Sequence, residues 1–281
     1  MRTVTFNPFL LIIFCCLLLR LPASAQPDQS STTNEPAITT TLTNTGGANA
    51  GAGHDEKLKA LRAKIRLLAQ DPNRSWTEYE QVGRELIAEF PEQPDGYDAL
   101  LAVMQMGDPK RAKLVAEELT NSSAPEEYRL FAKGFIYRKD LYGKPVALKF
   151  QALDGRAVDL SQMRGKVVLI DFWATGCVPC VEALPEITAV YDKYHDQGFE
   201  VVGISFDTDK EDLARFIKER GLHWPESFDG AGFLNNKFGL QFGVRAIPHT
   251  LIIDKKGCLV IDSLYIPHRL EGAVTNLLAQ P

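Results

Sequence analysis

The sequence predicts a chain with two folded parts, a small all-α domain followed by an α/β domain with a mixed sheet. Two observations predict this order. Over residues 54–137, apolar residues recur at helical spacing and the connections are short, which is typical of antiparallel helix pairs. Over residues 141–281, short apolar runs rich in Val and Ile alternate with helical stretches, as in a sheet flanked by helices.

The composition is that of an ordinary globular protein. The 281 residues are 45% hydrophobic and 24% charged. The formal net charge is -5 and the isoelectric point about 5.6, so no basic surface favours a nucleic-acid partner.

The N-terminus has the pattern of a secretory signal peptide over residues 1–25. Arg2 precedes a run of apolar residues, and residues 23–25 supply the small side chains of a cleavage site. A retained single-span anchor is the alternative, but the run is short for a span of about 20 residues, and Arg20 interrupts it. We therefore expect an exported protein of the periplasm or cell envelope, attached to the membrane only if this segment is uncleaved.

Residues 26–53 are rich in Ser, Thr, Asn, Gly and Ala, and we predict a disordered linker there. So few apolar side chains cannot offset the entropy lost on ordering.

In the helical domain, Ser75 and Asp108 are placed to cap helices. The expected helices cover residues 58–70, 76–90, 94–106 and 109–119, and a fifth begins at 125. We interpret this domain as a packing or docking module.

The α/β domain is expected to begin with a hairpin at residues 146–160. The runs at 166–172 and 199–206 are almost continuously apolar, which is typical of strands buried on both faces. The remaining elements are helices at 177–195 and 209–220, strands at 249–254 and 258–262, and a last helix at 267–279.

The cysteines favour a redox site. Removal of the signal peptide would leave Cys177, Cys180 and Cys258, a close pair and a bystander. At the start of a helix, first-turn N–H groups and the helix dipole favour the thiolate of Cys177, which we expect to be the exposed nucleophile. Cys180 would resolve the mixed disulfide. The alternatives are half a zinc site, which lacks two further ligands, and a structural disulfide, which stabilises little across so short a loop.

Residues 171–180, with the sequence DFWATGCVPC, resemble the thioredoxin family. The preceding hairpin, Trp-Pro at 224–225 and Ile-Pro at 247–248 resemble its TlpA/ResA branch of exported oxidoreductases. The resemblance covers about residues 141–280 and implies a thioredoxin-like fold with an extra N-terminal hairpin. It also implies a thiol–disulfide oxidoreductase without a cofactor, whose partners are protein thiols or disulfides and an upstream electron donor.

The resemblance gives roles to single residues. Cys177 would attack and Cys180 would resolve. Asp171 stands where the family has a buried carboxylate, and burial raises the pKa of such a group, which suits it to accept the proton of Cys180. Trp173 matches an aromatic residue beside the site, with a structural or a substrate-binding role.

Pro248 matches the cis-proline that faces the cysteines in this family, so the main chain of Ile247 would pair with an extended substrate segment. An ordinary trans proline is the alternative.

The chain also departs from the family. Gly176 replaces a tryptophan, Ala183 stands where many members of the branch have a glutamate, and His249 replaces a threonine. We expect His249 to be a solvated loop residue; the alternative is that it lies near the sulfurs and favours the thiolate. We expect no metal site.

The leading hypothesis is thiol–disulfide exchange with envelope proteins, in the direction of a reductase. Peroxide reduction is an alternative, although the Pro-x-x-x-Thr-x-x-Cys stretch of peroxiredoxins is missing. A copper-binding chaperone with His249 as third ligand is another, disfavoured by the narrow cysteine spacing. The helical domain could instead make the chain chiefly an interaction protein.

Overall fold

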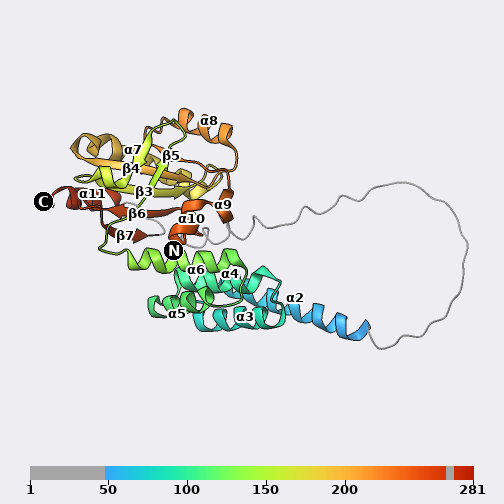
Figure 1. Cartoon of the computed structure of the whole chain (residues 1–281). Coiled ribbons are helices and arrows are strands. Elements are labelled where there is room, and N and C mark those ends of the chain that lie inside the picture. The colour runs from blue at the N-terminus through green and yellow to red at the C-terminus, as the bar shows by residue number, and fades with distance from the viewer. Residues whose placement is uncertain (1–47, 264–268) are drawn as a thin grey trace, which may run out of the picture. The chain divides into compact units, whose positions relative to one another are not determined.

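A computed structural model describes residues 48–263 and 269–281 (Figure 1). The predicted signal peptide and most of the predicted linker lie outside these residues. The chain divides into two compact units, Met1–Leu100 and Leu101–Pro281. This division differs from the predicted boundary between residues 137 and 141, because the last helix of the predicted helical domain packs against a helix of the α/β domain.

The first unit contains α2 (Ala48–Gln70), α3 (Trp76–Glu89) and the start of α4 (Pro94–Met106). Ser75 caps α3 as expected, accepting the N–H of Glu78 at 3.2 Å. Helix α2 begins before residue 54, where the helical domain is predicted to start, and takes in the end of the predicted linker. The alanines among its first residues favour a helix and Gly51 and Gly53 oppose it, but an existing helix lengthens at little cost.

The second unit begins with the end of α4 and continues with α5 (Pro109–Thr120) and α6 (Glu126–Asp140). Asp108 caps α5 as predicted, accepting the N–H groups of Lys110 and Arg111. Helix α6 packs against α5 and against α10 (Lys237–Phe242), a short helix of the α/β domain.

The α/β domain is built on a five-stranded sheet in the order β5-β4-β3-β6-β7. Its strands are β3 (Val167–Trp173), β4 (Phe199–Ser205), β5 (Glu226–Ser227), β6 (His249–Ile253) and β7 (Leu259–Ser263). Strands β3, β4 and β5 are parallel, and β6 is antiparallel to β3 and to β7. All of β3 is buried, as its apolar run predicts. A separate hairpin of β1 (Lys149–Gln151) and β2 (Ala157–Asp159) precedes the sheet. The expected thioredoxin-like fold with its extra hairpin is confirmed.

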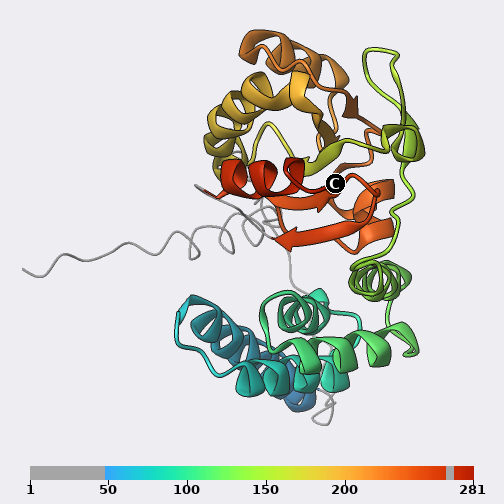
Figure 2. The same ribbon diagram turned by 90° about the vertical axis from the view of Figure 1, so that its left-hand side faces the viewer.

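Helix α7 (Val178–Tyr194) and helix α11 (Leu270–Leu278) pack against each other beside the sheet (Figure 2). Helix α8 (Lys210–Arg220) follows β4 and ends at Gly221 as predicted. Strand β5, helix α9 (Gly232–Asn235) and helix α10 are not predicted from the sequence, because each is too short for a periodic pattern. No helix within residues 48–263 and 269–281 has the length and apolarity needed to cross a bilayer.

Candidate active site

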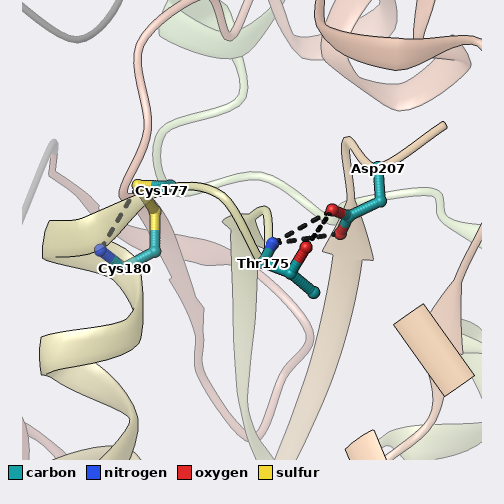
Figure 3. The surroundings of a disulfide bond; sticks show 4 residues. All are labelled: Thr175, Cys177, Cys180 and Asp207. Carbon is teal, nitrogen blue, oxygen red and sulfur yellow. Dashed lines mark hydrogen bonds between the residues drawn. A yellow bond between two sulfur atoms is a disulfide. The ribbon is translucent and has the colours of Figure 1, made fainter. Parts of the chain in front are cut away.

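A disulfide joins Cys177 to Cys180 at the N-terminus of α7 (Figure 3). Cys177 is the N-cap residue of the helix, and its Sγ accepts the N–H of Cys180 at 3.3 Å. The two Cα atoms are 5.2 Å apart. The predicted position of the pair, where strand gives way to helix, is confirmed, and the first-turn N–H groups are placed to stabilise a thiolate on Cys177.

The disulfide is largely buried. Only 7% of Cys177 and 3% of Cys180 is exposed, whereas the neighbouring Val178 is 56% exposed. The expectation that Cys177 is exposed is therefore wrong for the oxidised site, because the bond to Cys180 draws its sulfur against the helix. Cys177 is still the more exposed of the two, which favours it as the sulfur that an incoming thiol reaches first.

Asp207 holds the loop between β3 and the cysteine pair. Its carboxylate accepts the backbone N–H of Thr175 at 3.1 Å and the hydroxyl of Thr175 at 2.6 Å (Figure 3). It also accepts the hydroxyl of Ser205 at 2.8 Å. The loop after β3 is thus tied to the end of the adjacent parallel strand β4. Asp207 is not among the site residues predicted from the sequence. Its position just beyond the carboxyl end of a buried strand is the available signal, because ligand and catalytic groups gather there in such sheets.

We expect Asp207→Ala to loosen this loop. The variant loses three hydrogen bonds to a carboxylate, so the free energy of unfolding should fall by about 2 kcal/mol, and disulfide turnover should fall with it. Asp207→Asn keeps an acceptor for Thr175 and should lie between the alanine variant and the wild type. Urea unfolding and a peptide-disulfide assay measure both quantities. Wild-type stability in Asp207→Ala would show that the hydrogen bonds to the Asp207 carboxylate do not stabilise this loop.

Asp171 is buried in the middle of β3, 3% exposed, as the resemblance implies. Burial raises the pKa of its carboxyl to about 7, so the group can take up and release a proton at neutral pH. Asp171 and Pro248 line one cavity of about 20 Å³, enough for a single water molecule. The other residues that line it come from β3, α7, β6 and α11: Leu169, Ala183, Glu186, Ile187, Thr250 and Leu270.

Glu226 is a second buried carboxyl that sequence analysis did not identify. It accepts the indole N–H of Trp173 at 2.9 Å and that of Trp224 at 2.8 Å. Burial, partly opposed by the hydrogen bond from Trp173, raises its pKa to about 8. Buried acids with such pKa values gather at functional sites, which makes Glu226 a candidate site residue.

Strand register places the two acids on one face of the sheet. Asp171 on β3 pairs with Gly203 on β4, and Gly203 pairs with Glu226 on β5. A Cβ atom at Gly203 would overlap the carboxylate of Glu226, so the glycine leaves the space that this carboxylate fills. The charge of Asp171 contributes to the raised pKa of Glu226, because two nearby carboxylates oppose each other's ionisation.

Glu226→Gln should change how stability depends on pH. The raised pKa means that folded wild-type protein binds a proton more tightly than the unfolded chain, so its stability falls as the pH rises from about 4.5 through about 8. Glutamine stays neutral. We expect the two proteins to differ by about 1 kcal/mol or less at pH 5, and the variant to be more stable by on the order of 3 kcal/mol at pH 9. Urea unfolding at both pH values measures this.

The exposed carboxylate of Glu219 on α8 provides a matched control, and Glu219→Gln should follow the wild-type stability at every pH. Parallel stability curves for wild type and Glu226→Gln would contradict the assignment of a buried, proton-binding acid.

Trp173 does not lie where a substrate could contact it. Its side chain is 1% exposed and donates its indole N–H to Glu226. The substrate-binding role proposed for Trp173 is therefore wrong, because its ring fills the core at the end of β3. Its burial and its hydrogen bond to Glu226 support the structural role.

The peptide bond between Ile247 and Pro248 is cis, as the resemblance implies. Both residues precede β6, the strand that pairs with β3 beside Asp171. Pro248 shares the cavity of Asp171 with residues of α7, so the proline segment and the helix that carries the cysteines converge on one place. Ala183 and Glu186 both line this cavity from α7.

His249 is buried, contrary to the expectation of a solvated loop residue. It is 4% exposed, and its Nε2 lies 2.8 Å from an Oδ atom of Asp262 on β7. The reason is that His249 begins β6 and faces the neighbouring strand rather than solvent. Burial, together with the positive charge of Arg138, lowers its pKa to about 4.

Comparison with known proteins agrees with the interpretation of this site as a thiol–disulfide redox site. Residues 142–271 match the Redoxin family. The chain is 33% identical over 129 residues to the thiol-disulfide oxidoreductase ResA of Bacillus thuringiensis, which covers 44% of this chain and 71% of the relative. It is 29% identical over 136 residues to ResA of Halalkalibacterium halodurans, and this match covers 47% of this chain and 74% of the relative.

Solved structures include similar proteins. The thioredoxin domain of a thiol-disulfide oxidoreductase from Bacteroides vulgatus is 27% identical, with a TM-score of 0.44, and the match covers 49% of this chain and 97% of that one. The Cys-x-x-Cys disulfide at the start of α7 lies within residues 142–271, which match the Redoxin family. The chain therefore belongs to the ResA-like thiol–disulfide oxidoreductases of the thioredoxin superfamily.

Proposed function

We propose that this oxidoreductase reduces disulfides of exported protein clients, with the client chain lying along Ile247 and Pro248. The observation that carries the proposal is the convergence on one cavity of three parts: the helix that begins at the redox pair, the buried acid Asp171 and the cis-proline. A backbone segment before a strand can bind an extended client as an added strand does.

In the proposed reaction, the Cys177 thiolate attacks one sulfur of the client disulfide, and the other client sulfur leaves as a thiolate and takes a proton from water. Asp171 then accepts the proton of the Cys180 thiol. The resulting thiolate attacks the Sγ of Cys177, which forms the Cys177–Cys180 disulfide and releases the second client thiolate. The client gains two electrons, and an upstream dithiol donor must return two electrons to the pair.

The proposed location is the cell envelope. The signal-peptide pattern of residues 1–25 supports export. In an oxidising compartment, an open Cys-x-x-Cys pair stays reduced only while a donor supplies it. This is why an upstream electron donor belongs to the proposal.

The reduction potential of the Cys177–Cys180 couple tests the direction of transfer. Equilibration of the protein with glutathione buffers, read by mass spectrometry of alkylated thiols, measures it. A reductase should give a potential below about -220 mV, and Cys258→Ser should give the same value. A potential near about -120 mV, in the range of strong oxidants, would contradict the proposal.

A further inference from the structure

Residues 244–248 form the loop that carries the cis-proline. A buried arginine of α6 holds the start of this loop. Arg138 is 2% exposed, and its Nη1 donates hydrogen bonds to the carbonyl oxygens of Phe242 at 2.7 Å and Gly243 at 2.8 Å. These carbonyls end helix α10, where a cation is favoured by the helix dipole. The start of the loop is therefore fixed by a side chain from a helix far upstream in the sequence.

The same guanidinium also fixes the other end of the loop. Its Nε lies 3.2 Å from Oδ2 of Asp262, and Oδ1 of Asp262 lies 2.8 Å from Nε2 of His249, the residue that follows Pro248. Lys139, the next residue on α6, adds a contact of 2.7 Å to Asp262. One buried charge is thus connected to both flanks of the cis-proline segment.

The middle of the loop contacts the same helix. The guanidinium of Arg245 lies over the rings of Tyr128 and Phe131 on α6, 4.9 and 5.3 Å from their centroids. Close approach of α6 to α10 depends on Gly134 and Gly243, because a Cβ on either would overlap the backbone of the other element. Figures 1 and 2 show α6 beside α10. Helix α6 therefore supports the loop at its start, middle and end.

We propose that α6 is part of the client-binding site and that Arg138 is a positioning residue, which holds the Ile247–Pro248 backbone in the path that an extended client segment pairs with. Arg138 lies upstream of residues 142–271, the part of the chain that matches the Redoxin family. The inference rests on the proposed docking of clients along Ile247.

The physical reason is preorganisation. Binding a client strand to a mobile loop costs the entropy of ordering that loop, and a loop fixed in advance avoids this cost. A buried arginine is a weak means of stabilising a fold, because desolvation offsets much of its attraction to a carboxylate. The hydrogen bonds of Arg138 described here end on one flank of the loop, at the carbonyls of Phe242 and Gly243, and on Asp262, which holds the other flank through His249. Their specific effect is to set the course of this backbone.

The test compares a client that needs the loop with a reagent that does not. The client is a synthetic extended peptide containing one disulfide, and the reagent is dithiothreitol, which reduces the Cys177–Cys180 bond directly. In Arg138→Met we expect the KM for the peptide to rise by about tenfold, while kcat and the rate with dithiothreitol stay within about twofold of wild type. Arg138→Lys should recover part of the loss. Arg129→Met, which removes an exposed arginine from the same helix, should match wild type.

The outcomes separate the two proposals. A KM within about twofold of wild type in folded Arg138→Met, or an equal fall in the peptide and dithiothreitol rates, would overturn the positioning role. Should Arg138→Met fail to fold, the half-buried Arg245→Gln replaces it, with a rise in KM of about threefold expected and an unchanged KM counting against the inference. A wild-type protein that cannot reduce the peptide at all would overturn the proposed function itself.

Discussion

Cys177→Ser should abolish disulfide turnover, lowering the rate by at least about 10³-fold, because a serine hydroxyl has neither the acidity nor the nucleophilicity of the thiol that it replaces. The helix N-terminus stabilises charge on the residue at its N-cap, but this cannot turn an alcohol into an effective nucleophile at neutral pH. An insulin or peptide reduction assay with dithiothreitol as electron source, corrected for the uncatalysed rate, measures the loss.

Cys258 provides the matched control for this prediction. It is a free, half-buried cysteine beside the turn between β6 and β7, and we expect Cys258→Ser to retain wild-type turnover within about twofold. Substantial turnover by Cys177→Ser, or loss of turnover in Cys258→Ser, would show that Cys177 is not the nucleophile.

Asp171→Asn should lower turnover by about 10²-fold at pH 7, because the amide cannot accept the proton of Cys180. The wild-type rate should change most steeply near pH 7, where the buried carboxyl ionises, and the variant should lose this step. Turnover of the peptide disulfide from pH 5 to 9 gives both results. A variant with a wild-type pH profile would remove Asp171 from the mechanism.

The same substitution should stabilise the protein, which distinguishes lost chemistry from lost folding. The pKa of Asp171 is about 7 in the folded protein and near 4 in the unfolded chain, so wild-type stability falls as the pH rises from about 4 through 7. Asparagine has no charge to bury. The variant should exceed the wild type by on the order of 3 kcal/mol at pH 8 and match it more closely at pH 4, as measured by urea unfolding.

The parts that the sequence predicts correctly are those encoded by short local patterns. The Cys-x-x-Cys spacing after an apolar run defines the helix N-terminus, since few other arrangements place two sulfurs one turn apart. Ser75 and Asp108 mark helix starts because a cap acts on the next few residues. The cis state of Pro248 follows from a resemblance that spans several separated motifs in order.

The parts that the sequence does not predict depend on strand register and packing between distant segments. Glu226 lies in a two-residue strand, and its proximity to Asp171 exists only through Gly203 of the intervening strand. Arg138 is one of several charged residues on its helix, and nothing in the local sequence separates a buried arginine from a solvated one. The burial of His249 escapes prediction for the same reason, since its partner Asp262 comes from the next strand.

The division of the chain has a practical consequence. A truncated protein that starts at residue 141, where the predicted α/β domain begins, would lack α6 and with it Arg138. The compact unit that contains the redox pair instead begins at Leu101. Experiments on the site therefore call for the full chain, in which the cis-proline loop keeps its contacts with α6.

The central claim is that Cys177 attacks the client and Cys180 resolves the intermediate. It is tested most directly by mixing reduced Cys180→Ala with an oxidised disulfide peptide and mapping the adduct by mass spectrometry. A covalent adduct on Cys177 that persists until a reductant is added is the predicted result, and Cys177→Ala should form far less adduct in the same time. An adduct that forms faster on Cys180 in Cys177→Ala, or mainly on Cys258, would contradict the account.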